Sequence, residues 1–248
     1  MKILLVDIET APNIAYVWGL FKENIPLARL IESGYVLCWA AKWLGEDQIY
    51  FDSLGQSKER KMIERIHNLL DQADVVIHYY GTNFDIPTLN KEFIKLGLPP
   101  PSPFKQLDLL KTVKNQFKFP SNKLDYVSKA LGIGQKVKHI GYELWTKCMH
   151  NDPEGWKQME EYNIQDVILL EKLYLKIRPW IKNHPNIGIY LDEDKLVCPS
   201  CGSSRINKKG YAYTRTYKYQ RFQCKDCRSW FRSNKNLGKK PQEYFNTI

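Results

Sequence analysis

The sequence predicts an α/β domain with a mixed sheet, followed by a small basic tail. Along residues 1–180, apolar β-branched runs alternate with segments in which apolar residues recur at helical spacing, which is typical of α/β proteins. The early strands follow one another through a short turn, and the later ones are joined through helices. We therefore expect antiparallel and parallel neighbours in one sheet.

The first half of the domain is expected to contain three strands and one helix. Residues 2–8 are aliphatic and end at two acids, as a buried strand would. Residues 35–43 and 48–52 flank a glycine-containing turn, which predicts a hairpin. Residues 57–72 carry apolar side chains at helical spacing, with Ser57 as the expected N-cap.

The second half continues with alternating strands and helices. Residues 74–80 predict a fourth strand, and a helix is expected from about residue 86. Residues 106–110 predict a short fifth strand. A helix capped by Ser121-Asn122 should end near a pair of glycines, and the last long helix should span 153–178.

Composition sets the expected boundaries and argues against membrane insertion. The 248 residues, 43% hydrophobic and 26% charged, suit a domain at 1–180, a linker at 181–196 and a tail at 197–248. No uncharged apolar run approaches the roughly 20 residues of a transmembrane helix. Asp7 comes too early for a signal peptide. We expect a cytoplasmic protein without a membrane partner, in the host cytoplasm if a virus encodes it. The sequence does not indicate any protein partner.

Acidic residues in three separate stretches are the strongest functional signal. Asp7 and Glu9 lie two apart on a strand and so share one face. Asp85 precedes a helix start, where the helix dipole favours the ionised carboxylate. Tyr162 and Asp166 lie four apart on a helix and share a face. Taken alone, the first stretch would be interpreted as a turn, the second as an N-cap and the third as a surface pair. Together, converging carboxylates without a basic partner are typical of a Mg²⁺ or Mn²⁺ site.

Such a site suits phosphoryl transfer. Two hard cations would stabilise the attacking and leaving oxygens, and the Tyr162 hydroxyl would orient the attacking water.

The same three stretches carry a family resemblance. They read Asp7-Ile8-Glu9-Thr10, Asn83-Phe84-Asp85-Ile86-Pro87 and Tyr162-Asn163-Ile164-Gln165-Asp166, and they resemble the exonuclease motifs of the DEDD superfamily of 3′→5′ exonucleases. The spacing Tyr162-x-x-x-Asp166 resembles the DEDDy branch. The likeness covers residues 1 to about 180. It departs at Tyr80, where many relatives have asparagine before the glycine.

The resemblance implies a ribonuclease H-like fold, with a mixed five-stranded sheet flanked by helices. It implies that Tyr162 positions the attacking water and that Thr10 contacts the terminal nucleotide. It also implies that two Mg²⁺ or Mn²⁺ ions are bound by Asp7, Glu9, Asp85 and Asp166.

The function that this resemblance implies is metal-dependent 3′→5′ hydrolysis of nucleic acid to nucleoside monophosphates. The expected substrate is single-stranded or has a free 3′ end, with DNA slightly favoured over RNA. Two alternatives remain open: a nucleic-acid-binding adaptor with a vestigial nuclease site, and a structure-selective endonuclease on the same fold.

The tail differs from the domain in charge and cysteine content. Residues 197–248 hold twelve Lys and Arg against two Asp and Glu, whereas residues 1–196 hold twenty-five of each, so the net charge of +10 belongs to the tail. A polyanion partner, commonly nucleic acid, is expected; a solubilising tail is the plainer alternative. Four cysteines form two CxxC pairs, which favours one structural Zn²⁺ in a zinc ribbon over a redox dithiol: Cys198, Cys201, Cys224 and Cys227.

Aromatic and basic residues alternate between the two cysteine pairs. On one extended strand they would share a face able to stack bases and contact phosphates: Tyr211, Tyr213, Arg215, Tyr217, Tyr219 and Arg221. Alternatively, the tyrosines only cover a small ribbon. The segment resembles zinc ribbons of transposases and other nucleic-acid-binding proteins.

Overall fold

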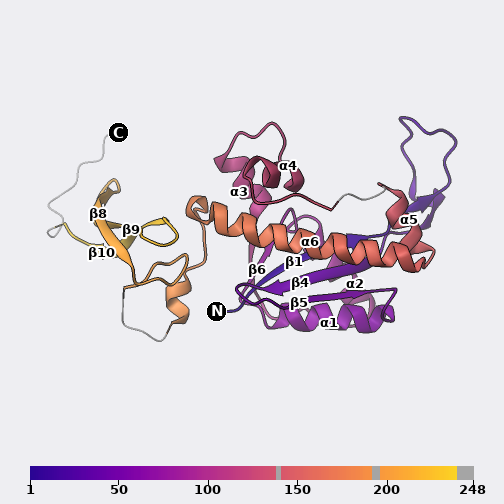
Figure 1. Cartoon of the computed structure of the whole chain (residues 1–248), viewed down its shortest axis with the longest axis horizontal. Helices are drawn as coiled ribbons and strands as arrows, with labels where there is room; N and C mark the ends of the chain where they lie inside the picture. The colour runs from indigo at the N-terminus through magenta and orange to yellow at the C-terminus, as the bar shows by residue number, and fades with distance from the viewer. Residues whose placement is uncertain (138–140, 192–195, 239–248) are drawn as a thin grey trace. The chain divides into compact units, whose positions relative to one another are not determined.

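The computed structural model describes three stretches of the chain, residues 1–137, 141–191 and 196–238 (Figure 1). The chain forms two compact units that divide between Leu173 and Tyr174. Part of the predicted linker, 192–195, and the end of the predicted tail, 239–248, lie outside the described residues. No helix in the described stretches combines the length and the apolar character needed to cross a membrane.

The first unit is built on a five-stranded sheet in the order β5-β4-β1-β6-β7. β1 pairs antiparallel with β4 and parallel with β6, so the sheet is mixed. β5 extends the antiparallel side and β7 the parallel side. The predicted fold class is therefore confirmed. The strands are β1 (Ile3–Thr10), β4 (Val36–Trp43), β5 (Ile49–Ser53), β6 (Val75–His78) and β7 (Lys105–Asp108).

Helices cover both faces of this sheet (Figure 1). α1 (Glu59–Asp71) and α2 (Asp85–Lys95) pack against one face, where they bury Leu4, Val6 and Ile8 of β1. α5 (Glu143–Met149) and α6 (Pro153–Ile177) pack against residues of the opposite face. Because side chains alternate along a strand, Asp7 and Glu9 belong to the face that α5 and α6 cover.

Two short helices and two helix starts differ from the sequence prediction. The prediction missed α3 (Leu109–Gln116) and α5, because two turns are too short for apolar periodicity to stand out. Ser57 does not cap α1; Lys58 occupies that position, and the Ser57 amide donates to Ser53 O at 2.9 Å. Ser121-Asn122 likewise does not cap α4 (Leu124–Ala130), where Lys123 takes the cap position.

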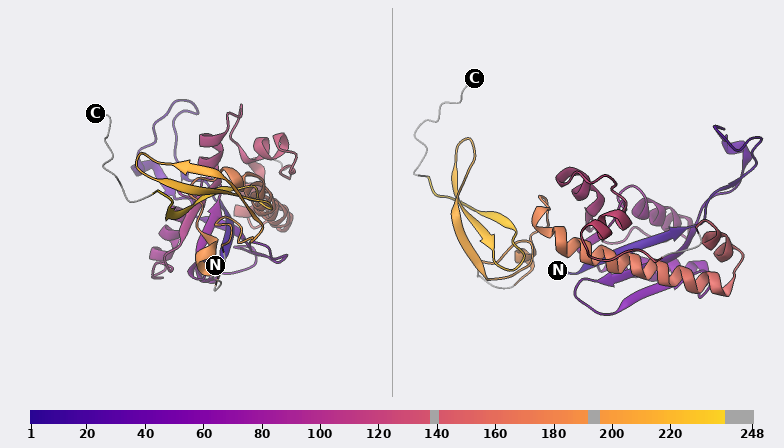
Figure 2. Two further views of the ribbon diagram at one scale, coloured as in Figure 1. Left: turned by 90° about the vertical axis from the view of Figure 1, so that its left-hand side faces the viewer. Right: turned by 45° about the horizontal axis from the view of Figure 1, so that its top comes forward.

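The segment between β1 and β4 leaves the sheet as a projecting hairpin (Figure 2). It contains β2 (Ile14–Ala15), a 3₁₀ turn at Leu27–Arg29 and β3 (Leu30–Glu32). The Glu23 carboxylate accepts hydrogen bonds from the amides of Trp18 and Gly19 and pairs with Arg29. These contacts stabilise the projecting hairpin from within its own residues.

The second unit contains a three-stranded antiparallel sheet in the order β10-β9-β8 (Figure 2). Two 3₁₀ turns, Arg178–Trp180 and Ile187–Tyr190, precede it. Cys198, Cys224 and Cys227 are buried and form its small core with Cys201, Ile206 and Phe231. The strands are β8 (Ile206–Tyr213), β9 (Lys218–Cys224) and β10 (Trp230–Asn236).

The expectation that Tyr211 to Arg221 form one extended strand is wrong. The chain reverses between β8 and β9, where the Thr214 amide donates to Tyr217 O at 2.9 Å and the Tyr217 amide donates to Thr214 Oγ1 at 3.1 Å. Arg215 lies in this turn. Tyr211 and Tyr213 lie on β8, and Tyr217 lies in the connection. Tyr219 lies on β9 opposite Ala212, so it points away from the face that carries Tyr211 and Tyr213.

Candidate active site

Three carboxylates from two distant segments converge beside the central strand. Asp7 and Glu9 come from β1, and Asp166 comes from α6. One carboxylate oxygen from each lies within 4.8 Å of the others. The Asp166 side chain is buried and the other two are partly exposed. The structure thus brings together three of the four acids that the sequence predicts as metal ligands.

The fourth acid, Asp85, lies next to this group without joining it. Asp85 is the first residue of α2 and is 4% exposed. Its Oδ1 accepts a hydrogen bond from the Ile8 amide at 3.2 Å, so it faces the backbone between Asp7 and Glu9. Its charge still acts on both of those carboxyl groups.

Burial raises the pKa of the carboxyl groups around β1. Burial, followed by the charges of Asp166, Glu9 and Asp85, holds the pKa of Asp7 well above its usual value. Burial and the Asp166 charge raise the pKa of Glu9 to about 8. Burial raises the pKa of Asp85 to about 7. Burial therefore favours the protonated form of these carboxyl groups, and a bound cation would displace the protons.

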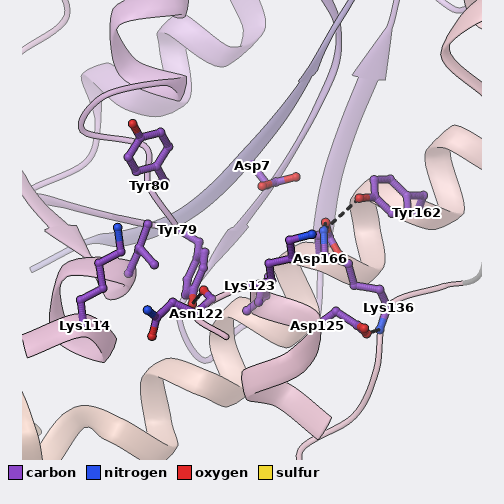
Figure 3. Close-up of a pocket in the computed structure, with 12 residues that line it drawn as sticks. Asp7, Tyr79, Tyr80, Lys114, Asn122, Lys123, Asp125, Lys136, Tyr162 and Asp166 are labelled. Atoms are coloured by element: carbon purple, nitrogen blue, oxygen red, sulfur yellow. Dashed lines mark hydrogen bonds and ion pairs between the residues drawn. The ribbon is translucent and has the colours of Figure 1, made fainter. Parts of the chain in front are cut away.

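Lys136 is a site residue that the sequence analysis missed. Its Nζ pairs with Asp166 Oδ2 and donates a hydrogen bond to the Tyr162 hydroxyl at 2.9 Å (Figure 3). Burial alone would lower the pKa of Lys136, but Asp166 and Tyr162 raise it overall. Lys136 therefore places a positive charge beside the acids. Its sequence position, shortly after a double-glycine turn, gave no sign of this role.

Two further side chains orient the carboxylates of β1. Asn163 donates from Nδ2 to Asp7 Oδ2 at 2.7 Å, and the Trp145 indole donates to Glu9 Oε2 at 3.2 Å. Trp145 also packs edge-on against the Tyr162 ring, with centroids 5.8 Å apart. Asn163 lies inside the third acidic motif, so its position in that motif was the available sequence signal.

An open cavity of about 690 Å³ adjoins the acids (Figure 3). Asp7, Tyr162 and Asp166 line it at one end. Tyr80, whose φ of 77° is left-handed, also lines it. The other lining residues include Lys114, Asn122, Lys123 and Asp125.

Thr10, the predicted contact of the terminal nucleotide, lines a different cavity. This cavity has a volume of about 360 Å³, and its other lining residues are Pro12, Gly141, Tyr142 and Trp145. Trp145 joins it to the acid cluster through the Glu9 hydrogen bond.

Both groups of predicted ligands have donor sets that suit metal ions. Carboxylate oxygens within 4.8 Å of one another are the hard donors that Mg²⁺ and Mn²⁺ prefer. In the second unit, Cys198 Sγ lies 3.5 Å from Cys227 Sγ, and Cys201 Sγ lies 3.6 Å from Cys224 Sγ. Four sulfurs each about 2.3 Å from a tetrahedral Zn²⁺ would be separated by roughly 3.8 Å. The four thiols therefore fit a closed zinc site.

Fold and site together define a class, the ribonuclease H-like α/β domains with acids gathered on the central strand. The chain belongs to the RNase_H superfamily, whose family model matches residues 38–178. β1, with Asp7 and Glu9, precedes the matched range.

Two comparisons found DNA polymerases that are similar to this chain. A DNA polymerase of Thermococcus litoralis is 27% identical over 193 residues, which make up 67% of this chain and 11% of that polymerase. The family B DNA polymerase of the hyperthermophilic archaeon Pyrobaculum calidifontis superposes with a TM-score of 0.52 at 19% identity, over 72% of this chain and 24% of that one. The second similarity is one of fold. The chain corresponds to a small part of each polymerase.

Proposed function

We propose that this protein is a divalent-metal-dependent nuclease that hydrolyses nucleic acid from the 3′ end and releases nucleoside monophosphates. The observation that carries the proposal is the convergence of Asp7, Glu9 and Asp166 within 4.8 Å beside Tyr162. The similarity to DNA polymerases supports nucleic acid as the substrate and slightly favours DNA over RNA.

The acids would hold two Mg²⁺ or Mn²⁺ ions, with Asp85 completing the ligand set. When bound, such ions lower the pKa of the attacking water and stabilise charge on the attacking and leaving oxygens. Asn163 and Trp145 keep the carboxylates of β1 oriented. The Tyr162 hydroxyl, held by Lys136, would position the water by a hydrogen bond.

The second unit would be a Zn²⁺-dependent nucleic-acid-binding ribbon. We propose a nuclease domain at 1–180, a linker at 181–196 and a ribbon at 197–248. The support is the fit of four thiols to one tetrahedral ion and the net charge of +10 in the ribbon. Because so small a core buries little apolar surface, the ion would contribute most of its folding energy.

The test is digestion of matched DNA and RNA oligomers labelled at the 5′ end, with Mg²⁺, with Mn²⁺ or without either. A ladder that shortens from the 3′ end only with metal supports the proposal. Asp7→Ala and Asp166→Ala should each abolish cleavage. Glu161→Ala is the matched control, because Glu161 is an exposed acid on the same helix. Cleavage by both site variants at the normal rate would refute the proposal.

The same assay separates the two alternatives. A circular or 3′-blocked strand that is still cut would favour an endonuclease, since an exonuclease needs a free end. Tight binding without cleavage of any substrate would favour an adaptor with a vestigial site.

A further inference from the structure

The strand register of the second unit divides its side chains between two faces. Residues directly opposite each other in an antiparallel pair point to the same face. Arg221 lies opposite Arg232, and Gln223 lies opposite Trp230. Tyr219 is two residues from Arg221 on β9 and shares its face. We call the face that carries Tyr219, Arg221, Trp230 and Arg232 the arginine face.

The opposite face is partly used for packing. Phe222 of β9 lies opposite Phe231 of β10, and their rings stack with centroids 5.5 Å apart. Phe222 is 5% exposed, and Phe231 packs against the buried cysteines. Near the cysteines, the face that carries Phe222 and Phe231 therefore points into the small core of the unit, and the arginine face points away from that core.

On the arginine face, guanidinium groups and aromatic rings pair across the strands. The Arg232 guanidinium carbon lies 3.9 Å from the centre of the Tyr219 ring, and that of Arg221 lies 5.1 Å from the Trp230 ring. The Arg221 Nε also donates to Lys209 O at 2.9 Å, which fixes the guanidinium in place. Trp230 is nevertheless 52% exposed, so a large ring surface remains open to solvent.

No acid balances these cations within residues 196–238. The sequence has one acid in that range, Asp226, and its carboxylate pairs with Arg205 at 2.9 Å. A surface of rings and uncompensated guanidinium groups is complementary to a polymer of bases and phosphates. A duplex hides the faces of its bases, whereas a single strand exposes them.

The geometry points to the arginine face as a binding site for single-stranded nucleic acid. Bases stack on Trp230 and Tyr219, and phosphates contact Arg221 and Arg232. The site holds a strand without reading its sequence, because every base offers a flat ring. It deepens the proposed function by adding a second contact for the same substrate, and it does not depend on cleavage.

The test measures binding by the zinc-loaded full-length protein, without Mg²⁺ or Mn²⁺, to labelled dT20 and rU20 by fluorescence anisotropy. Trp230→Ala should weaken binding about tenfold, in line with the loss of one stacked base. Arg232→Gln should weaken binding and reduce the dependence of log Kd on log salt by about one unit. Trp230→Phe, which keeps a ring, should retain most of the affinity.

Two controls separate stacking from charge and from misfolding. Tyr190→Ala removes an aromatic ring that is 42% exposed in the 3₁₀ turn before the sheet. It should change Kd less than about twofold, because Tyr190 is not on the arginine face and the loss of a stacked base costs far more. An abasic 20-mer keeps the phosphates and lacks bases, so Trp230→Ala should leave its weaker binding unchanged. One Zn²⁺ per chain in each variant shows that the ribbon is folded.

Several results would refute the proposal that the arginine face binds single-stranded nucleic acid. These are normal dT20 binding by zinc-loaded Trp230→Ala, an equal loss in Tyr190→Ala, an equal loss on the abasic strand, or a preference for duplex. Because no cleavage is measured, these results are independent of the nuclease proposal. That proposal could fail while the arginine face still binds, and the reverse also holds.

Discussion

Replacing Lys136 by methionine should strengthen metal binding and weaken cleavage at the same time. The Lys136 ammonium pairs with Asp166 Oδ2, so it competes with any cation for that carboxylate. The same ammonium anchors the Tyr162 hydroxyl at 2.9 Å. One substitution therefore removes a competitor for the metal and a support for the water-positioning residue.

The size of the first effect follows from the distances. A divalent ion about 2.1 Å from a carboxylate oxygen that also accepts from Lys136 lies within about 5 Å of the ammonium. Even with the dielectric constant of water, that repulsion is about 1.7 kcal/mol, and it grows in a less polar site. The dissociation constant for Mn²⁺ should thus fall tenfold or more in Lys136→Met.

The second effect has the opposite sign. Without the ammonium, Tyr162 loses the hydrogen bond that Lys136 donates, and the site loses a positive charge near the developing negative charge. Loss of one such stabilising group typically lowers kcat about a hundredfold. Saturating Mn²⁺ should not restore the rate.

Calorimetric titration of the zinc-loaded protein with Mn²⁺, and single-turnover cleavage at saturating Mn²⁺, measure the two effects. Lys123→Met is the matched control, because Lys123 lines the same cavity and, among the described residues, has no ion pair with the three acids. It should change Mn²⁺ affinity less than about twofold, since exposed charges are screened by solvent. An unchanged Mn²⁺ affinity in Lys136→Met would refute the competition between ammonium and metal.

Three further predictions follow from single residues. The folded state raises the pKa of Glu9 from 4.5 to about 8, so it binds the Glu9 proton more tightly than the unfolded chain. The melting temperature without Mg²⁺ or Mn²⁺ should therefore fall as pH rises through this range, and it should fall more steeply than in Glu9→Gln, where only the raised pKa values of Asp7 and Asp85 remain. A pH profile identical to that of Glu9→Gln would contradict the shift. Cys224→Ser should abolish Zn²⁺ retention and expose the second unit to protease, while cleavage of short oligomers by the first unit continues; retained zinc would exclude the four-thiol site. Gly81→Ala would place a Cβ 2.4 Å from Cγ of the His78 ring, so it should destabilise the first unit by about 1–3 kcal/mol in urea unfolding; an unchanged midpoint would show that this contact is not rigid.

Local periodicity let the sequence predict much of the fold and part of the site. Aliphatic runs marked β1, β4 and β6, short segments at 48–52 and 106–110 predicted the other two strands, and the prediction that their sheet is mixed is confirmed. The i, i+2 spacing on β1 placed Asp7 and Glu9 on one face, and the i, i+4 spacing on α6 did the same for Tyr162 and Asp166. These relations lie within one element, where backbone geometry alone decides which side chains are neighbours.

Contacts between elements were decided only by the tertiary structure. Lys136 reaches Asp166 across 30 residues, and Trp145 reaches Glu9 across 136. In the second unit, the turn at 214–217 separated β8 from β9, and the pairing of β10 with β9 placed the Arg232 guanidinium over the Tyr219 ring. No period in the sequence encodes these pairs, because they depend on how separate elements pack and in which register strands align. The sequence by itself thus determined which residues could do chemistry, and packing decided which of them meet.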